Sequence, residues 1–311
     1  MLEKFGNDWR VLETAMCRHL NSEIALISEI GIRQLTGGKK LRALISLLSG
    51  RLCGLPQEQS EKMASAVEFI HAATLLHDDV VDEADTRRRQ DTTNRVYGNA
   101  AAVLVGDFLY SRASQIFSDI GNLRLLSRVA DATNQLSEGE VLQLIQRGNP
   151  ETAEEIYFSI IERKTANLFE IAAAGPAILT ENTEREKYLS EFGRHLGIAF
   201  QLVDDCLDYE GEDTGKNIGR DFAEGKMTLP VILAFASADL TKRKALMSEW
   251  RAGGGFADIL RLLRETGALG ETRQRAKQEI GFALQALKQC LACEARESLI
   301  MLASLSVDRR E

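Results

Sequence analysis

Residues 68–82 read EFIHAATLLHDDVVD, an apolar run that ends in the aspartate-rich pentad DDVVD at 78–82. Apolar residues in 61–81 occupy all sides of a helix instead of one stripe, which predicts a central helix buried by neighbours on several sides. The pentad recurs as DDCLD at 204–208, again after an apolar run at 196–203. The sequence therefore predicts two buried helices, each carrying carboxylates at its C-terminal end.

The spacing within each pentad indicates a metal site. Residues i and i+4 share a helix face, about 6 Å apart along the axis, which pairs Asp78 with Asp82 and Asp204 with Asp208. Crowded carboxylates at the negative end of a helix dipole are unfavourable unless a cation is present. Oxygen ligands without thiolates favour a hard ion such as Mg²⁺, which keeps waters and shares phosphate oxygens. A solvated acidic helix end is the alternative for one pentad alone, but the repetition favours metal binding.

Basic residues accompany both pentads and would offset phosphate charge. A turn at 37–42, GGKKLR, also gathers cations at a helix start, where anions bind and glycine lets the backbone approach closely. Each basic residue alone is more often part of a solvated patch, and His71 alone is more often a core histidine. Jointly they predict a site for two diphosphates and a hydrophobic tail. The basic candidates are Lys39, Lys40, Arg42, Arg87, Arg88, Arg89, Lys164, Lys216 and Lys226.

Apolar spacing is helical nearly everywhere, and no segment alternates with period two for long enough to predict a strand. Turn residues separate the helical segments, at Gly54, Gly98-Asn99, Gly121-Asn122 and Gly175-Pro176 among others. With only four prolines and 44% hydrophobic residues, the chain is predicted to be all-α. We expect one domain over residues 1–311, a bundle of about ten or more helices with buried central ones. The expected helices cover 41–53, 61–81, 103–116, 123–145, 156–174, 188–207 and 229–236.

Composition excludes several classes of protein. A net charge of −8 argues against broad nucleic-acid binding. Five cysteines, odd in number and without a pattern, suit a reducing compartment, and the lone Cys290–Cys293 pair indicates helix packing more than zinc or redox chemistry. No apolar run is long enough for a transmembrane helix, and the first ten residues lack the apolar core of a signal peptide. We therefore expect a cytoplasmic protein.

With these motifs the chain resembles the trans-isoprenyl diphosphate synthases, from about residue 25 almost to the C-terminus. The resemblance implies the all-α isoprenoid synthase bundle, usually a homodimer. Against the usual family sequence, this chain has Lys40 for Arg, Ala43 for Pro and Arg89 for Gly. The matching segments are GGKKLRA (37–43), EFIHAATLLHDDVVDEADTRRR (68–89), GNAAAVLVGDFLYSRA (98–113), EGEVLQL (138–144), KTANLFE (164–170) and FQLVDDCLDYEGEDTGKNIGRDFAEGKMTLP (200–230).

The resemblance also implies a role for each matching residue. The six pentad aspartates (Asp78, Asp79, Asp82, Asp204, Asp205, Asp208) would hold two or three Mg²⁺ ions, with Mn²⁺ as an alternative ion. The allylic diphosphate would be bound by Arg87, Lys164, Thr165, Gln201, Lys216 and Lys226. Isopentenyl diphosphate would be bound by Lys39, Arg42, His71 and Arg88.

The activity implied is a magnesium-dependent, successive 1'-4 condensation of isopentenyl diphosphate onto farnesyl or geranyl diphosphate. Thr74 and Ala73, four and five positions before Asp78, are not aromatic and should not block a tail, and in the family that the chain resembles small residues here go with long products. The segment pattern is most similar to the octaprenyl to decaprenyl diphosphate synthases, so we expect octaprenyl diphosphate for ubiquinone-type side chains. Phe117, about 15 Å along a helix from Asp107, is a candidate floor of that channel, although an ordinary core phenylalanine is an equal alternative.

Three other functions compete with this one. A shorter-chain geranylgeranyl or farnesyl synthase would share all these motifs. A terpene cyclase would not need the second diphosphate pocket indicated by the 37–43 turn. A non-catalytic partner subunit would be expected to lose acidic ligands, whereas all six aspartates are present.

Overall fold

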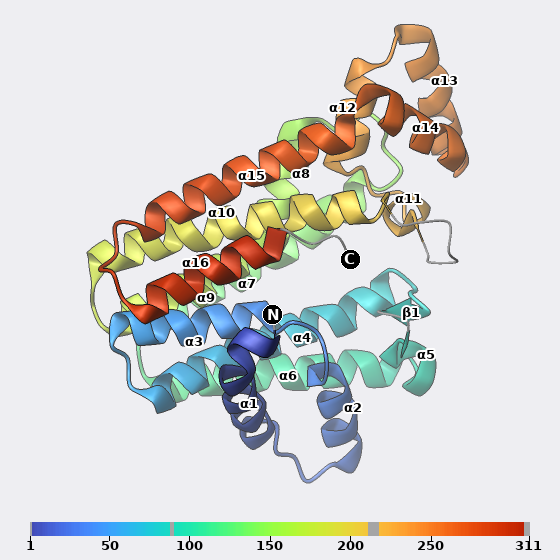
Figure 1. The fold of residues 1–311 in the computed structure, drawn as a ribbon. Coiled ribbons are helices and arrows are strands. Elements are labelled where there is room, and N and C mark those ends of the chain that lie inside the picture. Colours follow the sequence, from blue (N-terminus) through green and yellow to red (C-terminus); the bar gives the residue numbers. More distant parts are fainter. Residues whose placement is uncertain (1, 88–89, 211–217, 308–311) are drawn as a thin grey trace. The chain divides into compact units, whose positions relative to one another are not determined.

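The structure, a computed structural model, describes residues 2–87, 90–210 and 218–307, with side chains for those between residues 4 and 306 (Figure 1). Within these ranges the regular elements are helices, apart from one two-residue ladder of strands, β1 (Thr86–Arg87) and β2 (Gln90–Asp91). The all-α prediction is confirmed. The helices are α1 (Leu2–His19), α2 (Ala25–Leu35), α3 (Leu41–Cys53), α4 (Gln57–Val81), α5 (Thr93–Tyr97), α6 (Asn99–Ile120), α7 (Leu123–Gln146), α8 (Glu154–Ile161), the π-helix η1 (Glu162–Ala166), α9 (Asn167–Leu179), α10 (Thr183–Leu207), α11 (Arg220–Ala223), α12 (Leu229–Ser237), α13 (Leu240–Arg251), α14 (Phe256–Thr266), α15 (Ala268–Leu287) and α16 (Glu294–Val307).

The chain divides into two compact units, each assembled from segments that are distant in sequence. The first contains Met1–Ala130, Glu170–Ser190 and Cys290–Leu299, and the second contains Asp131–Phe169, Glu191–Gln289 and Ile300–Glu311. The first pentad lies in the first unit and the second pentad in the second unit. That residues 1–311 form a single domain stays a prediction.

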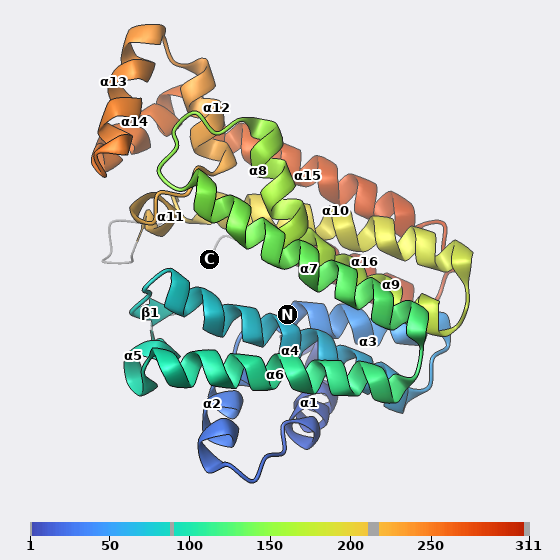
Figure 2. The same cartoon turned by 180° about the vertical axis from the view of Figure 1, so that it is seen from behind.

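Helix α4 is the central helix of the first unit. It packs along α6 and α3, and the three helices lie side by side in both Figure 1 and Figure 2. Its buried side chains point in several directions around the axis and include Met63, Phe69 and Leu76, all without exposed surface. Burial on several sides explains why the apolar residues here do not form one stripe, and the prediction of a buried helix before the first pentad is confirmed.

The second unit has its own core around α12. Leu229 and Phe235 of this short apolar helix pack in one cluster with Trp250 of α13, Leu262 of α14 and Leu202 of α10. The C-terminal half of α10 is therefore fixed in an apolar environment just before its aspartates. A buried helix before the second pentad is confirmed as well.

Two details differ from the predicted helices. Gly175-Pro176 does not break a helix, so that prediction was wrong: α9 continues to Leu179 with Pro176 inside it. Glycine is needed there for packing, because a Cβ on Gly175 would lie 2.1 Å from Met63 Cε. The segment predicted as one helix at 156–174 contains η1, whose wide turn is a local rearrangement often found at functional sites.

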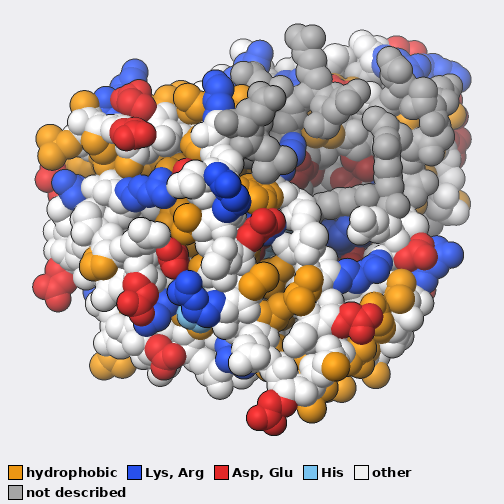
Figure 3. Space-filling model, turned by 60° about the horizontal axis from the view of Figure 1, so that its bottom comes forward, with side chains coloured by type: hydrophobic (Ala, Val, Ile, Leu, Met, Phe, Trp, Pro, Cys, Tyr) orange, Lys and Arg blue, Asp and Glu red, His pale blue; other side chains and the backbone are white. Residues whose placement is uncertain are grey.

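None of the described helices combines the length and apolarity that crossing a bilayer requires. On the face drawn in Figure 3, basic and acidic side chains are interspersed. The described part of that face therefore carries no wide surface of one charge, unlike the basic surfaces typical of nucleic-acid-binding proteins.

Candidate active site

The first pentad lies at the C-terminal end of α4. The Asp82 amide donates to the Asp78 carbonyl over 2.8 Å, so the helical spacing holds to the last residue of the pentad. Asp78 and Asp82 are partly exposed, whereas Asp79 is 2% exposed. The pentad thus presents two carboxylates one turn apart and turns the third toward the protein.

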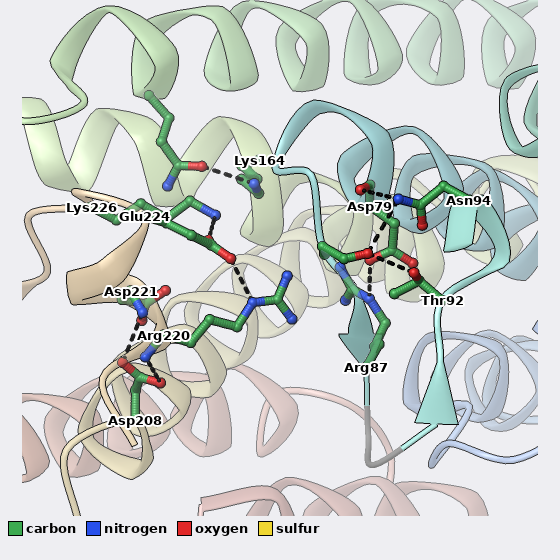
Figure 4. A network of polar contacts seen from close by, with 12 residues as sticks. Asp79, Arg87, Thr92, Asn94, Lys164, Asp208, Arg220, Asp221, Glu224 and Lys226 are labelled. Carbon is green, nitrogen blue, oxygen red and sulfur yellow. Dashed lines mark hydrogen bonds and ion pairs between the residues drawn. The ribbon is translucent and has the colours of Figure 1, made fainter. Parts of the chain in front are cut away.

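Asp79 ties the strand ladder to α4. Its Oδ1 accepts a hydrogen bond of 2.7 Å from Arg87 Nε on β1, and its carbonyl accepts one of 3.1 Å from Asn94 Nδ2 (Figure 4). Thr92 Oγ1 donates to the Ala84 carbonyl over 2.6 Å and closes the same loop. A guanidinium has further N–H donors on its two Nη atoms, so pairing through Nε is compatible with an anion at its outer edge.

The second pentad lies at the C-terminal end of α10 and contains a buried carboxylate in the same place. Asp205, 3% exposed, accepts hydrogen bonds from Tyr157 (2.6 Å, to Oδ2) and Gln201 Nε2 (2.8 Å, to Oδ1). The pKa of Asp205 is raised to about 7, chiefly by burial and further by the nearby charges of Asp204 and Asp208, while the two hydrogen bonds act in the opposite direction. Asp205 is therefore held by the protein, while Asp204 remains partly exposed.

Asp208 fixes the start of α11. Its two carboxylate oxygens accept from the amides of Arg220 (3.1 Å) and Asp221 (3.0 Å), the first residues of α11 (Figure 4). Burial raises the pKa of Asp208, while these amide hydrogen bonds lower it. Asp208 fixes the segment that leads to Lys226, which pairs with Glu224 at 2.5 Å.

The π-helix presents the next predicted residues. Lys164 Nζ donates to Glu140 Oε2 (2.7 Å) and Gln143 Oε1 (2.9 Å) of α7, and Thr165 Oγ1 donates to Gln201 Oε1 (2.8 Å). The wide turn lies close against α7, because a Cβ on Gly139 would be 2.9 Å from Arg163 Cβ. Thr165, Gln201, Asp205 and Tyr157 thus form one hydrogen-bonded chain within the second unit.

The GGKKLR turn and His71 meet in the first unit. Arg42 Nη1, on a 9% exposed side chain, donates to His71 Nε2 over 3.3 Å, so the imidazole accepts on that nitrogen. Lys39 is exposed beside them. Three of the four residues proposed for isopentenyl diphosphate therefore come from the turn before α3 (Lys39), the first turn of α3 (Arg42) and α4 (His71).

Some predictions lie outside the described residues, and others concern product length. Arg88, Arg89 and Lys216 fall in the undescribed segments. Ala73 and Phe117 are each 1% exposed, and Thr74 Oγ1 donates to the His71 carbonyl over 2.9 Å. That these residues line a channel, and that the two pentads share one cavity, stay predictions.

The sequence did not reveal several residues that hydrogen-bond the predicted site residues. Tyr157 was not singled out, and Glu140 and Gln143 received no role although they belong to the EGEVLQL segment. A buried tyrosine on α8, seven residues before Lys164, leaves no pattern in the sequence that separates it from an ordinary core residue. Only the folded chain places its hydroxyl against Asp205.

The donor set is compatible with Mg²⁺. Within the part of the chain that the structure describes, no three His, Cys, Asp or Glu side chains enclose a metal position by themselves. Mg²⁺ suits such a site, because it binds through one or two carboxylates and completes its octahedron with water and substrate phosphate. Three of the partly exposed aspartates, Asp78, Asp82 and Asp204, would supply those carboxylates.

Comparisons with known proteins give a consistent result. Residues 25–255 match the family model described as polyprenyl synthetase. The chain is 44% identical over 310 residues to the octaprenyl diphosphate synthase of Haemophilus influenzae, covering 97% of this chain and 94% of that protein. It resembles the structure of a decaprenyl diphosphate synthase from Rhodobacter capsulatus with a TM-score of 0.93, 38% identity and coverage of 100% and 98%. A polyprenyl synthase from Caulobacter crescentus, solved with calcium and isoprenyl diphosphate, matches with a TM-score of 0.90, 35% identity and coverage of 100% and 97%.

Proposed function

Because the chain belongs to the polyprenyl synthetase family and is a prenyltransferase that makes long all-trans polyprenyl diphosphates, we propose that its product is octaprenyl diphosphate. It would add isopentenyl diphosphate units to farnesyl or geranyl diphosphate. The product would serve as a quinone side chain. The 44% sequence identity to the octaprenyl diphosphate synthase of Haemophilus influenzae, which extends over nearly the whole chain, supports this product length.

The site assignment rests on a difference between adjacent aspartates that occurs in both pentads. In each Asp-Asp pair the second aspartate is buried and hydrogen-bonded by the protein, Asp79 by Arg87 and Asp205 by Tyr157. The first aspartate of each pair is partly exposed. We infer that Asp78 and Asp204, with Asp82, hold the ions, and that the buried members fix the helix ends.

The chemistry requires charge stabilisation and exclusion of water. Mg²⁺, when bound, would neutralise charge on the departing diphosphate, and it would be retained by the exposed aspartates. Lys164, Arg87, Lys226 and the predicted Lys216 would stabilise the same leaving group as the allylic C–O bond breaks. Thr165 and Gln201 would hold neighbouring polar groups in place.

Carbon–carbon bond formation needs the second substrate in line with the first. Lys39 and Arg42, with His71 and the predicted Arg88, would bind the diphosphate of isopentenyl diphosphate. Its C4 would attack C1 of the allylic cation, and transfer of a proton from C2 to the released diphosphate would give an allylic diphosphate one unit longer. The apolar surroundings of both helices would keep water from the cation.

The test uses the purified full chain with Mg²⁺, farnesyl diphosphate and labelled isopentenyl diphosphate. We expect the label to enter a long-chain diphosphate that co-migrates with octaprenyl standards, and activity to disappear with a chelator and return with Mg²⁺. Replacement by Mn²⁺ and a titration of ions per chain would test the predicted two or three sites. No incorporation, or a cyclic hydrocarbon formed without isopentenyl diphosphate, would contradict the proposal.

We further propose that two copies assemble as a homodimer in the cytoplasm, as the resemblance implies. Light scattering of the purified chain, whose mass is 34.5 kDa, would detect the assembly. A mass of one chain at micromolar concentration would contradict it.

A further inference from the structure

The turn before α3 has an unusual backbone. Gly37, Gly38 and Lys40 all have positive φ, of 80°, 66° and 41°. Glycine adopts this region freely, but for lysine it costs free energy and persists only where the surroundings impose it. Lys40 is also the residue from which α3 starts, since its carbonyl accepts the first helical hydrogen bond from the Leu44 amide at 2.9 Å. The backbone conformation of Lys40 therefore sets how Lys39, which precedes the helix, is oriented relative to Arg42 in its first turn.

The side chain of Lys40 is held by α1. It is 2% exposed, and its ammonium lies 4.5 Å from the centre of the Trp9 ring. Nζ also approaches Glu13 Oε1 at 3.4 Å and donates to the Gly37 carbonyl at 3.3 Å. The indole Nε1 of Trp9 donates to the same Glu13 oxygen at 3.0 Å. Trp9, Glu13 and Lys40 therefore form a closed triad.

Each contact of the triad offsets a cost of burying the ammonium. A buried lysine needs a counter-charge and hydrogen-bond acceptors, which Glu13 and the Gly37 carbonyl provide. A tryptophan face attracts a cation, and the attraction is stronger when water is excluded. The triad thus supplies the surroundings that keep Lys40 in its left-handed conformation, with its charge directed toward α1.

We propose that Trp9 and Glu13 are positioning residues for isopentenyl diphosphate, acting through Lys40. They would fix the GGKKLR turn so that Lys39 and Arg42 are already arranged for the diphosphate. The inference rests on the proposed function, because it takes Lys39 and Arg42 as ligands of that substrate. It assigns to the N-terminal helix a role in affinity for one substrate only.

The variants separate the ring face, the hydrogen bond and the charge. Trp9→Leu removes both the face and the indole N–H, Trp9→Phe keeps a face but not the donor, and Glu13→Gln keeps an acceptor but not the charge. Lys40→Met removes the cation, whereas Lys40→Arg keeps one that can still stack on the ring. The matched controls are Arg10→Ala, an exposed charge on the same helix, and Trp250→Phe, the same aromatic change in the second unit.

We expect Trp9→Leu and Lys40→Met to raise KM for isopentenyl diphosphate by about tenfold, a change of about 1.4 kcal/mol. KM for the allylic substrate should stay within about twofold, and Lys40→Arg should restore most of the affinity. Calorimetric titration of each variant with isopentenyl diphosphate alone, which cannot react without the allylic substrate, should show the same loss. Trp9→Phe and Glu13→Gln should give intermediate values.

Equal KM values for isopentenyl diphosphate in the parent chain and in folded Trp9 and Lys40 variants would overturn the proposal. So would a parallel rise for both substrates, which a general loosening of the structure would produce. If Trp9→Leu does not fold, Trp9→Phe and Glu13→Gln decide the question through the same comparison, the change in KM for isopentenyl diphosphate against the change in KM for the allylic substrate. A parent chain that does not incorporate isopentenyl diphosphate would instead refute the proposed function.

Discussion

The hydroxyl of Tyr157 donates a 2.6 Å hydrogen bond to Oδ2 of Asp205, and both side chains are buried. The bond joins α8 to the C-terminal end of α10 within the second unit. Gln201 occupies the other oxygen of Asp205 and is itself held by Thr165. A polar network therefore holds Asp205 of the second pentad on its buried side, and Asp204 of the same pentad lies on the partly exposed side.

Tyr157→Phe tests this support. Loss of one hydrogen bond to a buried carboxylate should cost about 1–3 kcal/mol of unfolding free energy, because Oδ2 is left without its donor. We also expect the Mg²⁺ concentration for half-maximal activity to rise several-fold as Asp204 loses its fixed position. Urea unfolding and a magnesium titration measure the two effects. Tyr97→Phe, which removes an exposed hydroxyl bonded to Glu29 at 2.7 Å, is the control and should leave both unchanged.

Asp78 and Asp79 are adjacent but should respond differently to substitution. Asp78→Ala removes a partly exposed carboxylate proposed to hold an ion, so turnover should fall by about 10²–10³-fold or more with little change in stability. Asp79→Asn weakens the pairing with Arg87, so unfolding free energy should fall by about 1.5–3 kcal/mol. Steady-state assays and thermal unfolding of both variants provide the comparison. Near-normal turnover in Asp78→Ala would contradict the metal assignment.

The five cysteines should fall into two classes of reactivity. Burial raises the pKa of Cys53 to about 11 and that of Cys206 to about 12, and burial also raises the pKa of Cys290. Because the thiolate is the reactive form, these thiols should react slowly at pH 8, while the exposed Cys17 and Cys293 react fast. Titration with a chromogenic disulfide should show two rapid equivalents in the native protein and five in urea. Rapid reaction of Cys206 would indicate that the end of α10 opens readily.

Much of this architecture could be predicted because apolar spacing and turn residues carry local information. The helix expected at 41–53 has the same bounds in the structure, and both pentads lie at helix ends as their apolar leaders indicated. Chemistry also followed from residue types, because six carboxylates after two apolar runs are hard to explain without a cation. Local signals were sufficient wherever one helix determined the result.

Tertiary contacts account for the rest. Pro176 signals a helix end in isolation, yet packing of Gly175 against Met63 keeps α9 continuous. The π-turn depends on the fit of Arg163 against Gly139, which lies 24 residues earlier. Likewise, nothing in DDVVD distinguishes Asp78 from Asp79 until Arg87 folds back onto one of them. These features depend on partners that are remote in sequence.

Ala73→Tyr tests the predicted course of the growing chain. Ala73 is buried in α4, five residues before Asp78, and a larger side chain in a packed position costs about 1–3 kcal/mol. If the tail runs along this side of α4, the ring should block it and the product should shorten by several isoprene units. Chromatography of the extracted products gives the length, and thermal unfolding shows that the variant is folded. An unchanged length in a folded, active variant would mean that the tail runs elsewhere.

Phe117→Ala tests the floor of the same channel from the other direction. Phe117 lies on α6, which packs along α4, and is among the largest fully buried side chains. Removing the ring should cost about 3–5 kcal/mol, since it leaves a cavity. That same cavity should let the tail extend, so the product distribution should move to longer chains if Phe117 is the floor. Phe235→Ala, an equally buried substitution in the core of the second unit, is the control for the loss of stability alone. Longer products in Phe117→Ala with unchanged products in Phe235→Ala would assign the floor to α6, whereas identical product lengths in both would leave Phe117 an ordinary core residue.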